Sequence, residues 1–367
     1  MTRIARIETN ANDDLAIVRV HTDDGAVGTG QTGARDARIT VGMLHAYIAP
    51  HYLGTDPWSH QVAQARCVRT TYKLTGSQLF RALAGVDTAI WDLLGQLTGR
   101  SVHELWGGAV RDEVPMYGSS MRRDTVPEAE AEALAAAIEH YGFRAVKFKI
   151  GSRMGEDDPA ARARTVRLIP LVRQRLGDDV ALAADANGAY TAAEAIRIGR
   201  RLDALGYYHF EEPCPFTDLH ATARVAAALD VQVAGGEQDH VMTRFADMIR
   251  LRAVNVLQFD VGYLGGASRG RRVAELAEAF GLTCTPHCGN HSLLQVFTLH
   301  LSAAMPAIDQ FQEWCITDDR SWAEALYEPV LVPRDGKLRV PTGAGWGITV
   351  NDDLLRGLDR RVSEVMT

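Results

Sequence analysis

The run Ala145-Val-Lys-Phe-Lys-Ile150 decides how this chain can fold. Its apolar and β-branched residues, followed by Gly151, predict a short buried strand. Because side chains alternate along a strand, Lys147 and Lys149 leave on one face and the apolar residues on the other. Two buried ammonium groups need compensating negative charge. The alternative is a half-exposed edge strand with two solvated lysines, and the residues downstream distinguish the two.

The downstream chain repeats one pattern, a short strand-like run that ends in a carboxylate or a histidine. These end residues are Asp185, Glu211, Glu237, Asp260, His287 and Glu313. They recur every 23 to 27 residues. A near-constant period of this length, with helical patterns between the strands, indicates repeated strand–helix units. The repeat therefore favours a buried strand at 145–150.

Length and charge bound the class of protein. The chain has 367 residues, of which 46% are hydrophobic, enough for a barrel of about 200 to 250 residues and a smaller domain. A net charge of −7 argues against nucleic-acid binding, which relies on clustered Lys and Arg. Residues 1–14 lack a signal-peptide core and the chain has no apolar run long enough to span a membrane. We expect a soluble, cytoplasmic homo-oligomer that binds neither nucleic acid nor membrane.

Two short motifs point to functions that the rest of the chain does not favour. Gly28-Thr-Gly30-Gln-Thr-Gly33 matches the dinucleotide fingerprint, but it follows a hairpin instead of opening a βαβ unit. We interpret its glycines as sites where a strand approaches another backbone closely. Cys284, His287 and Cys288 are spaced for zinc, but a fourth soft ligand is missing nearby. The five cysteines form no CxxC pair, which does not favour disulfides.

The pattern of elements predicts three segments. Residues 1–113 begin with a strand meander that turns at Asp24-Gly25 and continue as helices up to Gly99, which is typical of a small α+β domain. Residues 114–315 alternate strands and helices, and residues 316–367 are rich in loops. The alternation predicts a closed TIM-like barrel of the (β/α)8 type, more narrowly (β/α)7β, capped by the α+β domain, which the C-terminal segment completes. Helices are expected near 127–140, 159–176, 191–205, 218–229, 239–251, 267–280 and 291–304, with Thr191 and Asp218 as N-caps.

Three carboxylates end consecutive strands of this barrel. Asp185, Glu211 and Glu237 would meet at the carboxyl ends of the strands, where such barrels carry their active sites. Converging carboxylates repel one another unless a cation lies between them. Oxygen ligands alone favour Mg²⁺ and disfavour zinc. The alternative is three solvated acids at strand ends.

Two nitrogen bases flank these acids. Lys149 ends the strand before Asp185, and His287 ends a later strand beside Asp260, which can hold one ring nitrogen. Lys147 disfavours a second positive charge, so we expect it to lower the pKa of Lys149. Bases on both sides of a metal site suit removal of the weakly acidic proton α to a carboxylate. We expect a small carboxylate as substrate.

The ordered set of motifs resembles the enolase superfamily, in particular its mandelate racemase subgroup. The motifs are Lys147-Phe-Lys149, Asp185-Ala-Asn187, Phe210-Glu-Glu-Pro213, Gly236-Glu237, Gln258-Phe-Asp260 and Pro286-His287, preceded by the run from Ala84 to Gly108. The resemblance covers nearly the whole chain. Residues 9–14 are short where relatives commonly carry a longer lid, and Trp346 stands where relatives often have a smaller aliphatic residue. Both departures affect the expected substrate.

The resemblance implies a role for each matched residue. One Mg²⁺ per subunit would be held by Asp185, Glu211 and Glu237. Lys149 would be one acid/base, and the Asp260–His287 dyad the other. Lys147 would lie near the substrate carboxylate, Asn187 would contact the substrate, and Glu313 would hydrogen-bond the developing enediolate. Glu212 is expected on the opposite face of its strand and is not counted as a ligand.

The resemblance also implies a reaction. Relatives with both bases resemble hydro-lyases that dehydrate an aldonate or aldarate to a 2-keto-3-deoxy acid. The alternatives are a racemase or epimerase of a 2-hydroxy acid, and a lactone cycloisomerase. A non-catalytic barrel protein is a more distant alternative, because it would be expected to have lost a ligand or a base.

Overall fold

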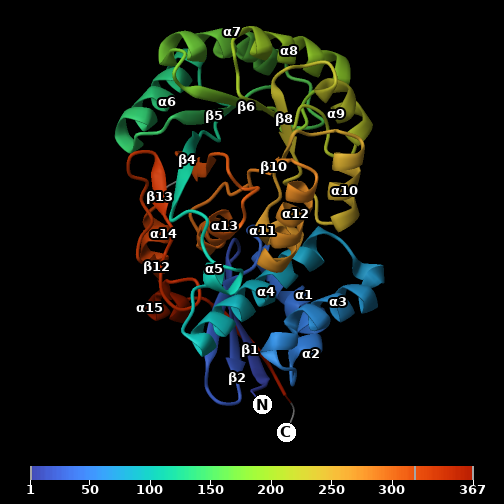
Figure 1. Ribbon diagram of the computed structural model, residues 1–367, viewed down its shortest axis with the longest axis vertical. Coiled ribbons are helices and arrows are strands. Elements are labelled where there is room, and N and C mark those ends of the chain that lie inside the picture. Colours follow the sequence, from blue (N-terminus) through green and yellow to red (C-terminus); the bar gives the residue numbers. More distant parts are fainter. Residues whose placement is uncertain (1, 318–319, 366–367) are drawn as a thin grey trace.

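The computed structural model describes residues 2–317 and 320–365. Two parts are evident in Figure 1: a ring of strands surrounded by helices, coloured green to orange, and a smaller N-terminal part in blue. The C-terminal segment, in red, runs along one side of the ring and returns to the smaller part.

An antiparallel sheet forms one layer of the smaller part. Its strand order is β15-β1-β2-β3, so the end of the chain supplies one edge strand. The turn predicted at Asp24-Gly25 is confirmed, because it joins β2 to β3 and Gly25 has a left-handed φ of 92°. The strands are β1 (Ile4–Ala11), β2 (Ala16–Thr22), β3 (Val27–Gln31) and β15 (Asp359–Glu364).

The long helix α4 (Ser77–Thr98) packs on this sheet. It ends as predicted at Gly99, whose φ is 64°. A Cβ at Gly28 would lie 2.2 Å from the carbonyl oxygen of Ala89, and one at Gly30 would lie 2.3 Å from the amide nitrogen of Ala89. The interpretation of these glycines as close-approach positions is therefore confirmed. The other helices here are α1 (Ala37–Met43), η1 (Leu44–Ile48), α2 (Ala49–Tyr52), η2 (Pro57–Ser59), α3 (His60–Thr70), η3 (Tyr72–Leu74) and α5 (Val102–Leu105).

Eight parallel strands of the described chain form the ring. Their order is β10-β9-β8-β7-β6-β5-β4-β11, so β4 lies between β5 and the last strand of the ring, β11. Near the other junction, the amide of Cys284 in β10 donates to the carbonyl of Ala307 at 2.7 Å. The predicted TIM-like barrel with an α+β capping domain is confirmed. The strands are β4 (Glu113–Ser119), β5 (Ala145–Lys149), β6 (Ala181–Asp185), β7 (His209–Glu211), β8 (Gln232–Gly235), β9 (Val256–Leu257), β10 (Thr283–Cys284) and β11 (Gln312–Cys315).

The helices predicted between these strands are present, within three residues at each end. Thr191 caps its helix with a full capping box, and the Asp218 carboxylate accepts from the amide of Ala221, as expected of N-caps. A single turn, α11 (Val261–Leu264), was not predicted, because it is too short to show helical periodicity. The longer helices are α6 (Pro127–Tyr141), α7 (Pro159–Leu176), α8 (Ala192–Ala204), α9 (Leu219–Ala226), α10 (Met242–Arg250), α12 (Ala267–Ala279) and α13 (Leu293–Ala304).

The C-terminal segment touches both parts. Its strand β13 pairs antiparallel with β4, and β15 pairs with β1. The side chain of Trp346 is buried and its Nε1 donates to the carbonyl of Thr88 in α4 at 2.9 Å. The boundaries expected at residues 113 and 315 stay predictions. The remaining elements are α14 (Ser321–Leu326), β12 (Tyr327–Glu328), β13 (Lys337–Arg339), β14 (Thr349–Val350) and α15 (Asp352–Arg356). None of the helices within the described residues is long and apolar enough to cross a membrane.

Candidate active site

The expected acids lie side by side because the strands are in parallel register. Lys149 is paired with Asp185 across β5 and β6, and Asp185 with Glu211 across β6 and β7. Glu237 follows the end of β8 by two residues. All four side chains are buried. The structure thus brings together, at the carboxyl ends of β5 to β8, the residues that the sequence placed there.

The two lysines compensate the acids directly. Lys147 Nζ lies 2.8 Å from both carboxylate oxygens of Glu211 and 3.0 Å from Oε1 of Glu313. Lys149 forms an ion pair with Asp185. Burial opposes the charge on Lys147, but Glu211 and Glu313 outweigh it and raise its pKa well above the ordinary value. The buried lysines are therefore stable only because the carboxylates surround them.

The expectation of a lowered pKa for Lys149 is wrong for this arrangement. Burial and Lys147 do lower it, but the carboxylates, Asp185 foremost, raise it by more, so the net pKa lies above the ordinary lysine value. The sequence argument counted the neighbouring ammonium group and left out the carboxylate paired across the strands. In a buried site the opposite charge at ion-pair distance has the larger effect.

The acid arc has the chemistry of a Mg²⁺ site. Burial, followed by the charge of the neighbouring Asp185, raises the pKa of Glu211 to about 8, although Lys147 opposes this increase. Oε2 of Glu237 is buried with no hydrogen-bond partner among the described residues. As the described side chains stand, no three His, Cys, Asp or Glu groups are arranged to hold a metal; Lys147 and Lys149 pair with Glu211 and Asp185 instead. The Glu237 oxygen lies 3.7 Å from His287 Nε2 but accepts no hydrogen bond from the described residues, and together with the all-oxygen donor set it fits a hard divalent cation.

Glu212 lies on the side of its strand away from Glu211, as alternation predicts, because it lines a small cavity with Leu219 of α9 and Met248 of α10. Its φ is +40°, so the extended backbone of β7 ends at Glu211. The side-chain Nδ2 of Asn187 donates to Glu212 Oε2 at 3.2 Å. Burial, followed by the charges of Glu237 and Asp185, raises the pKa of Glu212 well above its usual range. Glu212 is therefore a buried neighbour of the acid arc.

The histidine dyad lies across the barrel mouth from Lys149. His287 Nδ1 is 2.7 Å from Oδ2 of Asp260, and a backbone bridge joins the two residues. The other Asp260 oxygen accepts from the amide of Tyr263 at 3.0 Å, because Asp260 caps α11. The His287 side chain is 15% exposed, and its Nε2 lies 3.7 Å from Oε2 of Glu237. Burial opposes protonation of His287, but Glu237, Glu313 and Asp260 raise its pKa well above the ordinary value.

Glu313 closes the site from the last barrel strand. Its Oε1 accepts from Ser119 Oγ at 2.8 Å and its Oε2 from the amide of Cys288 at 2.9 Å. Oε2 also lies 3.8 Å from His287 Nε2. Burial raises its pKa, but Lys147 and His287 lower it by more. Glu313 is thus a fixed anion between Lys147 and the dyad.

Three polar side chains at the site were not identified from the sequence. Gln258 Nε2 donates to Glu211 Oε2 at 2.8 Å, and Ser119 binds Glu313 as described above. Arg123, in the segment after β4, donates from Nη2 to Asn187 Oδ1 at 2.7 Å. Gln258 and Ser119 lie in strand-end runs where their orientation follows from alternation. Arg123 lies in a loop, so no periodic signal pointed to it.

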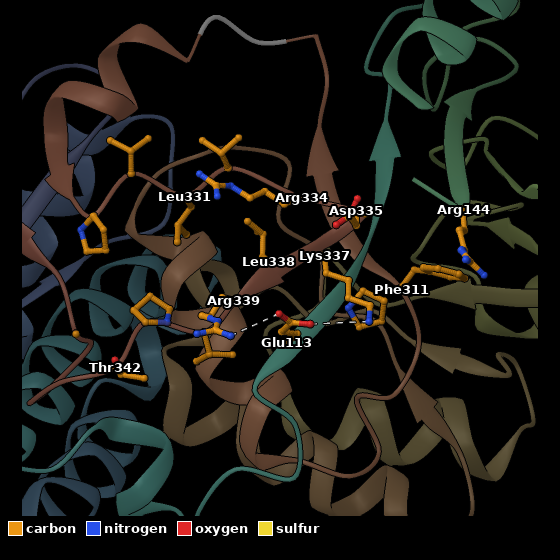
Figure 2. Close-up of a pocket in the computed structure, with 18 residues that line it drawn as sticks. Glu113, Arg144, Phe311, Leu331, Arg334, Asp335, Lys337, Leu338, Arg339 and Thr342 are labelled. Carbon is orange, nitrogen blue, oxygen red and sulfur yellow. Dashed lines mark ion pairs between the residues drawn. The ribbon is translucent and has the colours of Figure 1, made fainter. Parts of the chain in front are cut away.

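The cavity shown in Figure 2 lies at the other end of the barrel. Its volume is about 1090 Å³, and it is open to solvent. Glu113 begins β4, Arg144 directly precedes β5 and Phe311 directly precedes β11, so the cavity faces the amino-terminal ends of the strands. Lys337 and Arg339 lie 3.9 and 3.8 Å from Glu113 across it. This cavity contains none of the residues of the acid arc or the dyad.

Two curated proteins resemble this chain over most of their length. An arabinonate dehydratase from Saccharolobus solfataricus is 29% identical over 92% of this chain and 89% of its own. A D-galactarolactone cycloisomerase from Agrobacterium fabrum is 33% identical, over 92% of this chain and 89% of its own.

A solved structure matches the whole fold. The mandelate racemase/muconate lactonizing protein from Paracoccus denitrificans PD1222, complexed with magnesium, is 29% identical, with a TM-score of 0.88 over 100% of this chain and 99% of that one. Residues 3–107 match the family model of the mandelate racemase / muconate lactonizing enzyme N-terminal domain. Residues 129–354 match the enolase C-terminal domain-like model. This chain belongs to the enolase superfamily, in its mandelate racemase subgroup.

Proposed function

We propose that this protein is a Mg²⁺-dependent dehydratase of a sugar acid. The observation that carries the proposal is the placement of two bases, Lys149 and the Asp260–His287 dyad, on either side of a buried acid arc. Such a pair can remove one proton and deliver another within the same site. The arabinonate dehydratase among the relatives supports this reaction class.

The acid arc would hold one Mg²⁺ through Asp185, Glu211 and Glu237. Bound there, the ion supplies positive charge where negative charge develops on the substrate carboxylate. Lys147, which lies between Glu211 and Glu313, adds a fixed ammonium group to the same region. Asn187, whose backbone amide donates to Asp185, would orient the substrate.

The chain's own residues would then move two protons. Lys149, in its neutral form, takes the proton from C2, and the electron pair of that C–H bond forms the enediolate. Glu313 hydrogen-bonds to the enediolate in its protonated form, because an ionised carboxylate only accepts. The C3–O bond breaks, and protonated His287, held by Asp260, gives its proton to the departing hydroxyl, which leaves as water. The resulting enol tautomerises to the 2-keto-3-deoxy acid. The reverse assignment, with His287 removing the proton, uses the same groups.

A cycloisomerase or epimerase is the second candidate. The relative named D-galactarolactone cycloisomerase is 33% identical, slightly more than the dehydratase. Those reactions also begin with removal of the proton α to a carboxylate, but their product has the same mass as the substrate. Mass therefore separates the candidates.

The test is a screen of the purified protein with Mg²⁺ against mono- and diacid sugars. Formation of a 2-keto acid, detected by its carbonyl chemistry and by the loss of one water in mass spectrometry, is the expected result. A library in which only products of unchanged mass appear would replace the dehydratase with the second candidate. No turnover of any sugar acid or its lactone would overturn the proposal.

A further inference from the structure

Arg123 is a cation near Asp185 at the mouth of the site, and no carboxylate of the described chain forms an ion pair with it. It follows the end of β4 by four residues, and its side chain is half-buried. Nη2 donates to the neutral amide oxygen of Asn187, and Nε is buried with no hydrogen-bond partner. Within the described residues, none of the ion pairs includes Arg123. Burial lowers the pKa of its guanidinium, the charge of Asp185 opposes this decrease, and the nearby charge of Arg153 adds to it.

The neighbouring arginines differ in this respect. Arg122 pairs with Asp124 at 3.1 Å. Arg164 lies 3.7 Å from Glu130 and donates to the carbonyl of Lys149. A half-buried charge without a partner costs free energy that the fold does not recover by itself. Of Arg122, Arg123 and Arg164, Arg123 is thus the one available to bind an external anion.

The loop that carries Arg123 crosses the mouth of the barrel. A Cβ at Gly289 would lie 3.1 Å from the tip of Met121 and 3.3 Å from His287 Nε2, so the loop begins beside the dyad. Two residues later, Arg123 reaches Asn187, whose amide donates to Asp185. A substrate held between the dyad and the acid arc therefore lies under this loop, with Arg123 at its rim.

We propose that Arg123 binds a second carboxylate, at the far end of the substrate, so that the substrate is a sugar diacid. The inference rests on the proposed function, in which the reacting carboxylate already has Lys147 and the acid arc. A guanidinium matches a carboxylate with two parallel N–H···O bonds, and its unpartnered Nε supplies one of them. Hydroxyl groups of a monoacid would leave Arg123 without an ion pair.

The experiment compares diacids with monoacids of the same configuration, glucarate with gluconate and galactarate with galactonate. We measure kcat and KM with Mg²⁺ for the wild type and for Arg123→Gln, Arg123→Lys and the exposed control Arg122→Gln. Arg123→Gln should lower kcat/KM for the preferred diacid about 30-fold, mainly through KM, a change equal to ~2 kcal/mol. The effect on the matching monoacid should stay below about threefold. Arg123→Lys should restore part of the diacid preference, because it keeps the charge without the fork, and Arg122→Gln should leave both substrates unaffected.

Equal losses for diacid and monoacid would overturn the inference and leave Arg123 a residue that only positions Asn187. A wild-type preference for monoacids would overturn it as well. Calorimetric binding of the same four acids separates this inference from the proposed reaction. Diacid binding that depends on Arg123 without 2-keto acid formation would refute the dehydratase and retain the diacid site. Dehydration of monoacids without any diacid binding would support the dehydratase and refute the diacid site. If none of the four acids binds, the diacid site is refuted as well.

Discussion

Replacing Asp260 with asparagine tests the dyad without changing its volume. Asp260 accepts from His287 Nδ1 at 2.7 Å and from the amide of Tyr263 at 3.0 Å. Asparagine can keep the second bond through its carbonyl oxygen, so α11 retains its cap. Its amide group then faces Nδ1, which favours the other imidazole tautomer and removes the negative charge that stabilises protonated His287.

The structure sets the size of the expected effect. A hydrogen bond to a charged group contributes about 1.5 to 3 kcal/mol. If this contribution is lost in the transition state, kcat falls about 10- to 150-fold. Steady-state turnover of the best sugar acid measures the fall, and a thermal melt within a few degrees of wild type shows that the fold is kept.

A matched control is Asp87→Asn, another buried aspartate that accepts hydrogen bonds, from Gln64 Nε2 and the Ser268 amide, away from the site. It should change thermal stability and leave kcat unchanged. Turnover of the Asp260→Asn variant within about threefold of wild type would refute the assignment of the dyad. An equal loss in the Asp87→Asn variant would refute it too.

The remaining predictions concern the metal, the packing of the cap and one buried acid. Chelation should abolish turnover and Mg²⁺ should restore it, whereas Glu237→Gln should need far more Mg²⁺ for half-maximal activity; full activity after exhaustive chelation would contradict the metal site. Gly30→Ala should lower the free energy of unfolding in urea by about 1 to 3 kcal/mol, because its Cβ would meet the backbone of α4 at 2.3 Å. The control Gly42→Ala, in α1 with nothing within 4 Å of its Cβ, should raise it by about 0.4 to 1 kcal/mol. Equal effects of the two substitutions would refute the packing argument. Burial raises the pKa of Asp92 from 3.8 to about 6, so the folded state holds the Asp92 proton more tightly than the unfolded state does. This contribution to the free energy of unfolding is complete below about pH 4 and is lost as the pH rises through 6. The free energy of unfolding of Asp92→Asn should therefore rise relative to that of the wild type by up to ~3 kcal/mol between pH 4 and 7. Parallel curves of unfolding free energy against pH for the two proteins would argue against this pKa shift.

The barrel and the main site residues were predictable because they follow from period and alternation. The spacing of Asp185, Glu211 and Glu237 placed them on successive parallel strands, and the register of those strands brings them together. The dyad followed from the same reasoning, because Asp260 and His287 end neighbouring strands. The N-caps at Thr191 and Asp218 and the turn at Asp24-Gly25 were predictable from the residue types at those positions alone.

What could not be predicted depends on backbone dihedrals and on contacts between distant segments. The φ of +40° at Glu212, which ends strand β7 at Glu211, has no signal in the sequence. The pKa of Lys149 depends on an ion pair across strands. Arg123 reaches Asn187 through a loop, and β13 pairs with β4 across more than two hundred residues of sequence. Single-sequence periodicity carries no information on such contacts.

The most direct test of the central claim is turnover of an accepted sugar acid in D₂O, followed by mass spectrometry and NMR. If Lys149 removes the C2 proton and His287 expels the hydroxyl, the product has lost one water and carries deuterium at C3. The His287→Asn variant should yield little keto acid, although it can still exchange the C2 proton. A product that keeps every hydroxyl and carries deuterium at C2 with inverted configuration would contradict the dehydratase and make this protein an epimerase.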